Sequence, residues 1–112
     1  MPKTEDIVFK IKADFLRALS HPVRLQIIEC LKDGEASVGK LVQKLGVEQS
    51  SLSRHLAILR DLGVLEARQE KTSVYYNLHD HDIFKVLRPI SELLRKKLKR
   101  SEKLLESLGR DE

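Results

Sequence analysis

The chain has 112 residues, which is enough for one domain with a hydrophobic core. Its net charge of +4 favours a polyanionic partner, whereas an aromatic content of 4% argues against a platform that stacks single-stranded bases. No apolar run is long enough to cross a membrane, and the first residues lack the apolar segment of a signal peptide. With a single cysteine, Cys30, an intrachain disulfide is excluded, and we expect a cytoplasmic protein.

A first helix is predicted over residues 4–20. Thr4 is expected to cap it, and the acidic Glu5 and Asp6 suit the positive end of its dipole. Its apolar residues recur at helical spacing: Ile7, Val8, Ile11, Phe15 and Leu19.

A second helix is predicted from Pro22, a residue suited to the first helical position, to about Lys32. Its apolar residues are expected in the core: Val23, Ile27, Ile28 and Leu31. Asp33 and Gly34 close it.

Residues 37–62 are predicted to form two helices joined by a tight turn. Ser37 is placed to cap the first, and Gly46 is placed to end it in the left-handed conformation that glycine adopts without steric cost. The buried side of the pair comprises Val38, Leu41, Val42 and Leu45, then Leu52, Leu56 and Leu59. Polar residues open the outward side of the second helix: Gln49, Ser50, Ser51, Ser53 and Arg54. Such side chains reach base edges and phosphates in a major groove, so we predict a helix-turn-helix; the alternative is a helical hairpin with a solvated face.

In residues 64–78 the apolar period changes from that of a helix to that of a strand. The inward positions of a two-stranded hairpin would be Leu65, Ala67, Val74, Tyr76 and Leu78, with the tip at residues 69–72. A hairpin directly after a recognition helix is a wing, whose tip lies along a neighbouring phosphate backbone. We therefore predict a mainly α, winged helix-turn-helix domain that spans residues 1–112.

Residues 80–108 are again helical in pattern, and Pro89 must either kink this helix or start a second segment. Between residues 88 and 103 the chain carries seven basic residues (Arg88, Arg95, Lys96, Lys97, Lys99, Arg100 and Lys103) against Glu92 and Glu102. The first and last helices both need a partner for their apolar sides, because the small unit between them is too small to cover both. We predict a C2 homodimer; the alternative is that both fold back on the monomer. The expected interface residues are Ile7, Ile11, Phe15, Ile83, Leu87, Ile90, Leu94 and Leu98.

From Ala18 to Leu78 the sequence resembles the DNA-binding core of the ArsR-type transcriptional repressors. The resemblance lies in the segments HPVRLQII, QSSLSRHLAILRDLGVL and VYYNL. It implies a homodimeric repressor that binds an inverted repeat in double-stranded DNA and that often responds to an effector. Carried over by position, the DNA-binding residues are Ser37, Gln49, Ser50, Ser51, Ser53, Arg54 and His55, with Arg68, Lys71, Thr72 and Ser73 in the wing. Arg54 is the best candidate for base recognition, whereas for His55 a packing role is equally open.

Two departures from the family pattern concern local geometry. Glu48 replaces the usual Ser or Thr cap of the recognition helix, although Ser50 is placed to cap one turn later. Lys71 stands at the wing tip in place of a frequent Gly, which leaves the geometry of the turn open.

The known metal sites of the family are not reproduced. Ser37-Val38-Gly39 replaces the Cys-Val-Cys thiolate site, and in the register of the terminal-helix site His79, His81 and Glu92 are followed by the cationic Arg95. We expect no metal and no other cofactor. Cys30 is expected to be a small apolar core residue rather than a redox sensor, and the effector, an organic ligand or none, stays open.

A second interpretation is a winged helix that binds a protein and has only nonspecific affinity for nucleic acid. An enzyme is not expected, because no catalytic constellation or phosphate-binding loop is present.

Overall fold

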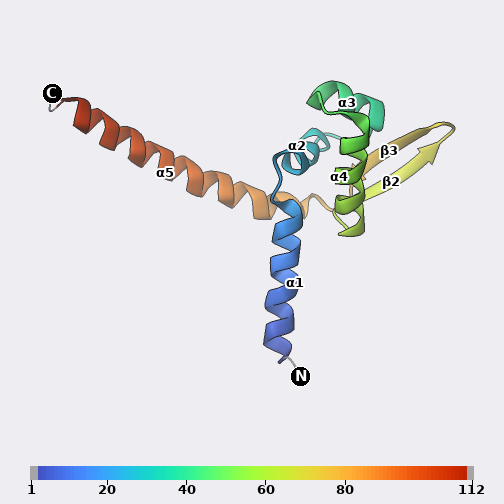
Figure 1. The fold of residues 1–112 in the computed structure, drawn as a ribbon, viewed down its shortest axis with the longest axis horizontal. Coiled ribbons are helices and arrows are strands. Elements are labelled where there is room, and N and C mark those ends of the chain that lie inside the picture. Colours follow the sequence, from blue (N-terminus) through green and yellow to red (C-terminus); the bar gives the residue numbers. More distant parts are fainter. Residues whose placement is uncertain (1–2, 111–112) are drawn as a thin grey trace. The chain divides into compact units, whose positions relative to one another are not determined.

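The structure is a computed structural model and describes residues 3–110. The chain divides after Asp80 into two compact units. The elements of the first are α1 (Thr4–Leu19), α2 (Pro22–Cys30), β1 (Ala36–Ser37), α3 (Val38–Leu45), α4 (Gln49–Asp61), β2 (Leu65–Glu70) and β3 (Ser73–Leu78) (Figure 1). The second contains the short helix η1 (His81–Ile83) and α5 (Phe84–Arg110). That the whole chain behaves as one domain stays a prediction.

The core of the first unit lies between α2, α3 and α4. Its side chains with 0% exposure are Ile27, Ile28, Leu31, Leu41, Leu52, Leu56 and Leu59. The buried side predicted for each of these helices is therefore confirmed at its centre, while Val23, Val42 and Leu45 are half-buried. Burial of a leucine contributes about 1.5–3 kcal/mol, so this cluster holds the three helices together.

The ends of the core helices are fixed by local contacts. The Ser37 hydroxyl accepts a hydrogen bond from the Lys40 amide at 3.1 Å, and Gly46 has φ 63°, as the sequence predicts. The cap predicted for α1 is wrong: Thr4 is already helical, and the Asp6 carboxylate accepts from the amide of Lys3 at 3.3 Å. At α2 the imidazole Nδ1 of His21 accepts from the Val23 amide at 3.2 Å.

The sheet has three antiparallel strands in the order β1-β3-β2. β2 and β3 pair from Leu65 with Leu78 to Glu70 with Ser73, so Lys71 and Thr72 form the tip of the hairpin. The third strand, β1, pairs Ala36 with Tyr76 and was not predicted, because two residues show no alternation. It joins the turn before α3 to the base of the wing.

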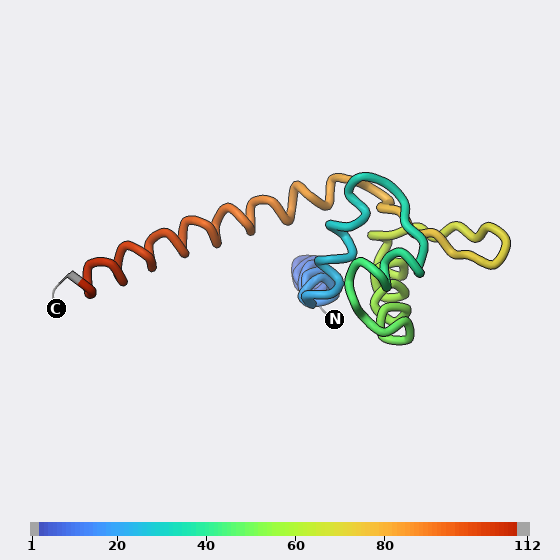
Figure 2. Tube along the Cα trace, turned by 90° about the horizontal axis from the view of Figure 1, so that it is seen from above, coloured from blue at the N-terminus to red at the C-terminus, as the bar shows by residue number. Residues whose placement is uncertain are grey.

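The burial predicted for the wing is only partly confirmed. Leu65, Tyr76 and Leu78 are buried, but Ala67 is exposed and Val74 half-buried. The hairpin projects beyond the helices of its unit (Figures 1 and 2), so no described helix of this unit covers the inner side of its outer half. The alternating pattern therefore reports strand conformation, not burial.

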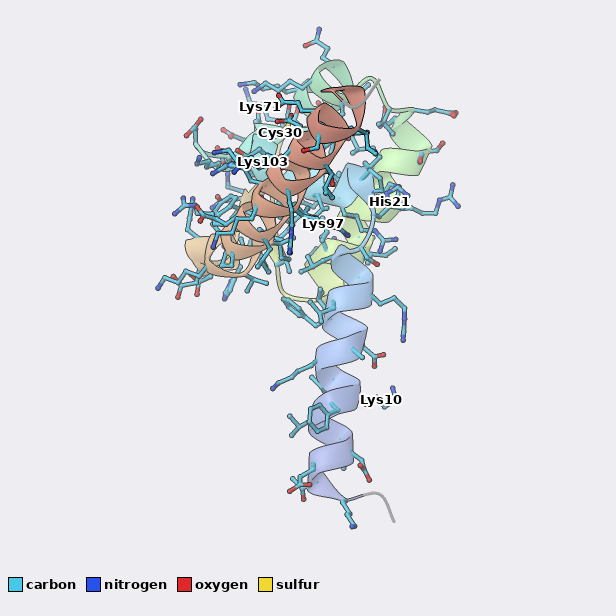
Figure 3. All side chains as sticks on the ribbon, turned by 90° about the vertical axis from the view of Figure 1, so that its left-hand side faces the viewer. Lys10, His21, Cys30, Lys71, Lys97 and Lys103 are labelled. Carbon is cyan, nitrogen blue, oxygen red and sulfur yellow. The ribbon has the colours of Figure 1, made fainter. Side chains whose placement is uncertain are left out.

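Most apolar side chains of α1 and α5 are exposed, apart from Leu19 and Phe84, which are buried. The N-terminal part of α1, where Lys10 is labelled, stands clear of the other elements of its unit (Figure 3). α5 is a single helix of 27 residues with Pro89 inside it, so Pro89 does not start a separate segment. Among residues 3–110, no helix is long and apolar enough to cross a membrane.

Candidate DNA-binding surface

α4 presents three kinds of surface at its N-terminal half. Because Leu52, Leu56 and Leu59 are buried, the period of about 3.6 residues turns Ser50 and Arg54 directly outward. Gln49 and Ser53 then lie on one flank, and Ser51 and His55 lie on the other. No side chain caps α4, and neither Glu48 nor Ser50 accepts a first-turn amide within residues 3–110. These amides are therefore available to an anion.

The flank of α4 beside the wing borders a groove of about 350 Å³. Four elements and a turn contribute to it: the end of β1, the start of α3, the start of α4, the wing tip and the start of β3. It is lined by Ser37, Val38, Gly39, Gln49, Thr72, Ser73 and Val74. The structure thus brings together four residues that the sequence predicts to contact DNA, from segments far apart in the chain.

The opposite flank of α4 borders a hollow of about 280 Å³, lined by Arg24, Ser51, Arg54, His55 and Ile58. Sequence reasoning missed Arg24, a charged residue that stands between the apolar Val23 and Leu25 of α2. The Nε–H of Arg24 donates to Nδ1 of His55 at 3.1 Å, and its Nη1 donates to the Ala18 carbonyl at 2.8 Å. Arg24 joins α2 to the recognition helix.

His55 is neutral in this arrangement. Its Nδ1 accepts from Arg24, which has only donors, so the ring hydrogen lies on Nε2. Burial lowers the pKa of His55, and the neighbouring His21, Arg24 and Arg54 act in the same direction. The rings of His21 and His55 lie 4.2 Å apart between centroids. His55 therefore has a packing contact on one side and a free N–H donor on the other.

The two predicted cations of the wing differ in their surroundings. The Arg68 guanidinium binds the carboxylates of Glu35 and Glu70, each at 2.7 Å, and lies 4.7 Å from the centroid of the Tyr75 ring. The hydrogen bonds that Arg68 donates to both carboxylates raise the pKa of Arg68. The Lys71 side chain, at the exposed tip, forms no ion pair or hydrogen bond within residues 3–110. Lys71 is thus available to an anion, whereas Arg68 fixes the wing to the turn before α3.

The possible metal ligands are dispersed. No group of three or more His, Cys, Asp or Glu side chains is placed to hold a metal in the part of the chain that the structure describes. His79 Nδ1 lies 2.6 Å from Oε1 of Glu66. Cys30 is half-buried and borders a hollow of about 120 Å³ together with Lys40 and Lys44.

Comparison with known proteins assigns the family. The model of the family described as "Bacterial regulatory protein, arsR family" matches residues 21–67. The HTH-type transcriptional regulator Rv0081 of Mycobacterium tuberculosis is 35% identical over 102 residues, which cover 90% of each chain. The chain belongs to the ArsR family. Its resemblance to these regulators, seen first in the sequence, is confirmed.

Solved structures extend this assignment to the fold. The crystal structure of Rv0081 superposes with a TM-score of 0.76 and covers 83% of this chain and 94% of that one. The repressor BigR of Xylella fastidiosa is 33% identical, with a TM-score of 0.67 and coverage of 82% and 96%. A homodimeric winged helix-turn-helix DNA-binding domain of Mycobacterium bovis is 25% identical, with a TM-score of 0.75 and coverage of 89% and 93%.

This ArsR-family chain is thus a DNA-binding transcriptional regulator with the winged helix-turn-helix fold, a family whose members are regulators rather than enzymes. The individual DNA contacts stay predictions.

Proposed function

We propose that the chain is a dimeric repressor that acts in the cytoplasm and binds an inverted-repeat operator in double-stranded DNA. The observation that carries this proposal is the surface of α4. Ser50 and Arg54 point outward, and a hollow lined by both polar and apolar side chains lies on each flank of the same half of the helix.

In this proposal the N-terminal half of α4 enters the major groove. Arg54 is exposed and forms no ion pair or hydrogen bond within residues 3–110, so its planar guanidinium is available to guanine N7 and O6. Gln49 and Ser53 face the wing side, where hydroxyls of Ser37, Thr72 and Ser73 supply further contacts. Lys71 binds a phosphate from the wing tip.

Dimerisation would cover the apolar sides of α1 and α5. In α1, Ile7 and Ile11 are 46% and 62% exposed; in α5, Ile90, Leu94 and Leu98 are 45%, 53% and 65% exposed. Phe15 and Leu87 are half-buried, and Ile83 is buried. The exposed side chains leave water when two copies pair, whereas Ile83 has little exposed surface left to lose. C2 symmetry then presents two α4 helices to successive major grooves. The homodimeric domain from Mycobacterium bovis supports this proposal.

We propose further that repression does not depend on the metal sites of the family. The Ser37 hydroxyl, at one of the thiolate positions, caps α3. An effector would be detected as a change in operator affinity when the DNA-binding assay is repeated with cell extracts and with thiol oxidants.

The test is binding to DNA from the promoter of the protein's own operon, followed by fluorescence anisotropy at two salt concentrations. A repressor is expected to prefer an imperfect palindrome over random DNA by a factor of about 10³ or more, with an affinity that falls steeply with salt. Equal affinity for both DNAs would overturn the proposal and would favour the protein-binding interpretation.

Arg54→Ala is the matching variant. We expect it to lower operator affinity by about tenfold or more per half-site, because a bidentate contact to guanine contributes about 1–3 kcal/mol. Arg60→Ala, which removes the same charge at the far end of α4, is the control and is expected to leave discrimination intact. Loss of the dimer in Arg54→Ala would contradict its placement on the DNA-binding side.

A further inference from the structure

Arg24 carries a half-buried positive charge without a carboxylate partner. Its two hydrogen bonds go to neutral acceptors, the Ala18 carbonyl and Nδ1 of His55, and it forms no ion pair within residues 3–110. A charge that has lost part of its water is ordinarily paired, so this arrangement leaves room for an anion.

The neighbours of Arg24 strengthen this argument. Arg54 adds a second guanidinium without an ion pair in the described residues, Ser51 adds a hydroxyl, and His55 adds its Nε2–H. Among residues 3–110, no acidic side chain lines the hollow. All of its polar groups are therefore able to donate hydrogen bonds, which suits an anion with several oxygen atoms.

The position of the hollow indicates which anion. A helix that lies in the major groove has a phosphate backbone on each side, because the groove is only about 12 Å wide. One flank of α4 borders the groove beside the wing, and the other borders the hollow around Arg24. The second backbone would therefore pass along the Arg24 side.

We propose that this hollow binds one phosphate of the operator backbone, held by Arg24, Ser51 and His55, while the nearby charge of Arg54 adds attraction. This inference rests on the proposed function, since it requires α4 in the major groove. The bonds of Arg24 to Ala18 and His55 fix the plane of its guanidinium before DNA arrives and leave its remaining N–H donors for the phosphate. Arg24 thereby fixes the depth and tilt of α4 rather than reading a base.

The test is a methylphosphonate scan of the operator, in which one phosphate at a time is made uncharged, with the wild-type protein and Arg24→Gln. Wild type is expected to lose about tenfold in affinity when the phosphate beside α4, distal to the wing, is neutralised in one half-site. Arg24→Gln is expected to lose affinity for operator DNA and for random DNA by about the same factor. Neutralising the phosphate beside α4 should cause this variant no further loss of affinity. Its sensitivity at every other phosphate should match that of wild type.

Controls separate this phosphate contact from a general loss of charge or of fold. Arg60→Gln removes one positive charge from the far end of α4 and should keep the full sensitivity at the phosphate beside Arg24. If Arg24→Gln does not fold by circular dichroism, His55→Leu carries the same test, because leucine has no N–H to donate to the phosphate.

Three distinguishable outcomes would overturn either the proposed phosphate contact or the proposed repressor function. Equal sensitivity of wild type and Arg24→Gln at every phosphate overturns the proposed phosphate contact but leaves the repressor intact. Arg24-dependent binding of inorganic phosphate that leaves operator affinity unchanged at constant ionic strength assigns the hollow to a free anion instead. Failure of wild type to distinguish operator from random DNA overturns the proposed function itself.

Discussion

The helices at the centre of the chain and those at its ends carry similar apolar patterns but have different surroundings. Leu52, Leu56 and Leu59 of α4 have no exposure, whereas Leu94 and Leu98 of α5, spaced in the same way, are more than half exposed. Helical periodicity therefore predicts which side of a helix avoids water but not what covers it. In the central helices the partner is another part of the same chain; for the terminal helices we propose a second copy.

The largest effect is expected in the central helices. Leu56→Ala should lower the free energy of unfolding by about 3–5 kcal/mol, because it opens a cavity among fully buried side chains that have little freedom to move into it. The measurement is urea denaturation at a fixed protein concentration. A decrease of less than about 1 kcal/mol would mean that the site relaxes or that α4 packs more loosely than the structure shows.

The terminal helices should respond differently. The double variant Leu94→Gln and Leu98→Gln should raise the dissociation constant of the dimer by about 100-fold or more, because several leucines per dimer lose an apolar partner. Helix content and the unfolding of the α2–α4 core should change little. Sedimentation equilibrium measures the first effect and circular dichroism the second.

The matched control for this variant is Lys99→Gln with Lys103→Gln, which have the same spacing and lie on the side of α5 opposite Leu94 and Leu98. An unchanged dimer in the leucine variant would contradict our assignment of α5 to the interface. A monomeric wild-type protein would contradict the dimer altogether.

The sequence predicts the elements whose causes are local. Ser37 and Gly46 set the ends of α3 through contacts with residues a few positions away, and the leucines of α4 follow from its period. Both features are visible in a short window of sequence, and both are confirmed.

Contacts between distant segments were not predictable in this way. β1 exists because Ala36 pairs with Tyr76, and the guanidinium of Arg68 binds Glu35 from 33 positions away. The bond from Arg24 to His55 spans 31 positions. No periodicity reports such pairs, so the sequence assigns Arg68 to DNA without showing that it is held by two carboxylates, and it gives no role to Arg24.

A smaller effect on stability is expected at the edge of the core, where His55 is half-buried. Since the pKa of His55 is lowered by burial and by the positive charges of His21, Arg24 and Arg54, the unfolded chain binds a proton more readily than the folded one. Stability should therefore be complete above pH ~6.5, the ordinary pKa of histidine, and should fall as the pH drops toward the folded pKa. Protonation of Nδ1 would also break its hydrogen bond with Arg24.

The measurement is urea denaturation of wild type and of His55→Gln between neutral pH and pH ~5.5, below the ordinary histidine pKa. The variant should lose less stability on acidification than wild type does. Parallel curves would mean that another group governs the acid response of the core.

The smallest effect on stability is expected at the wing tip, where Lys71 has φ 57°. This left-handed conformation costs a residue with a Cβ atom about 1 kcal/mol, and glycine avoids that cost but loses more entropy on folding. Lys71→Gly should therefore stabilise the protein by only a few tenths of a kcal/mol, whereas Lys71→Ala should not stabilise it. Both variants remove the same charge, so both should reduce the slope of log affinity against log salt by about 0.9 for each phosphate that the wing tip no longer neutralises. Equal stability of the two variants would show that the tip relaxes freely, and an unchanged salt slope would show that Lys71 lies away from the DNA backbone.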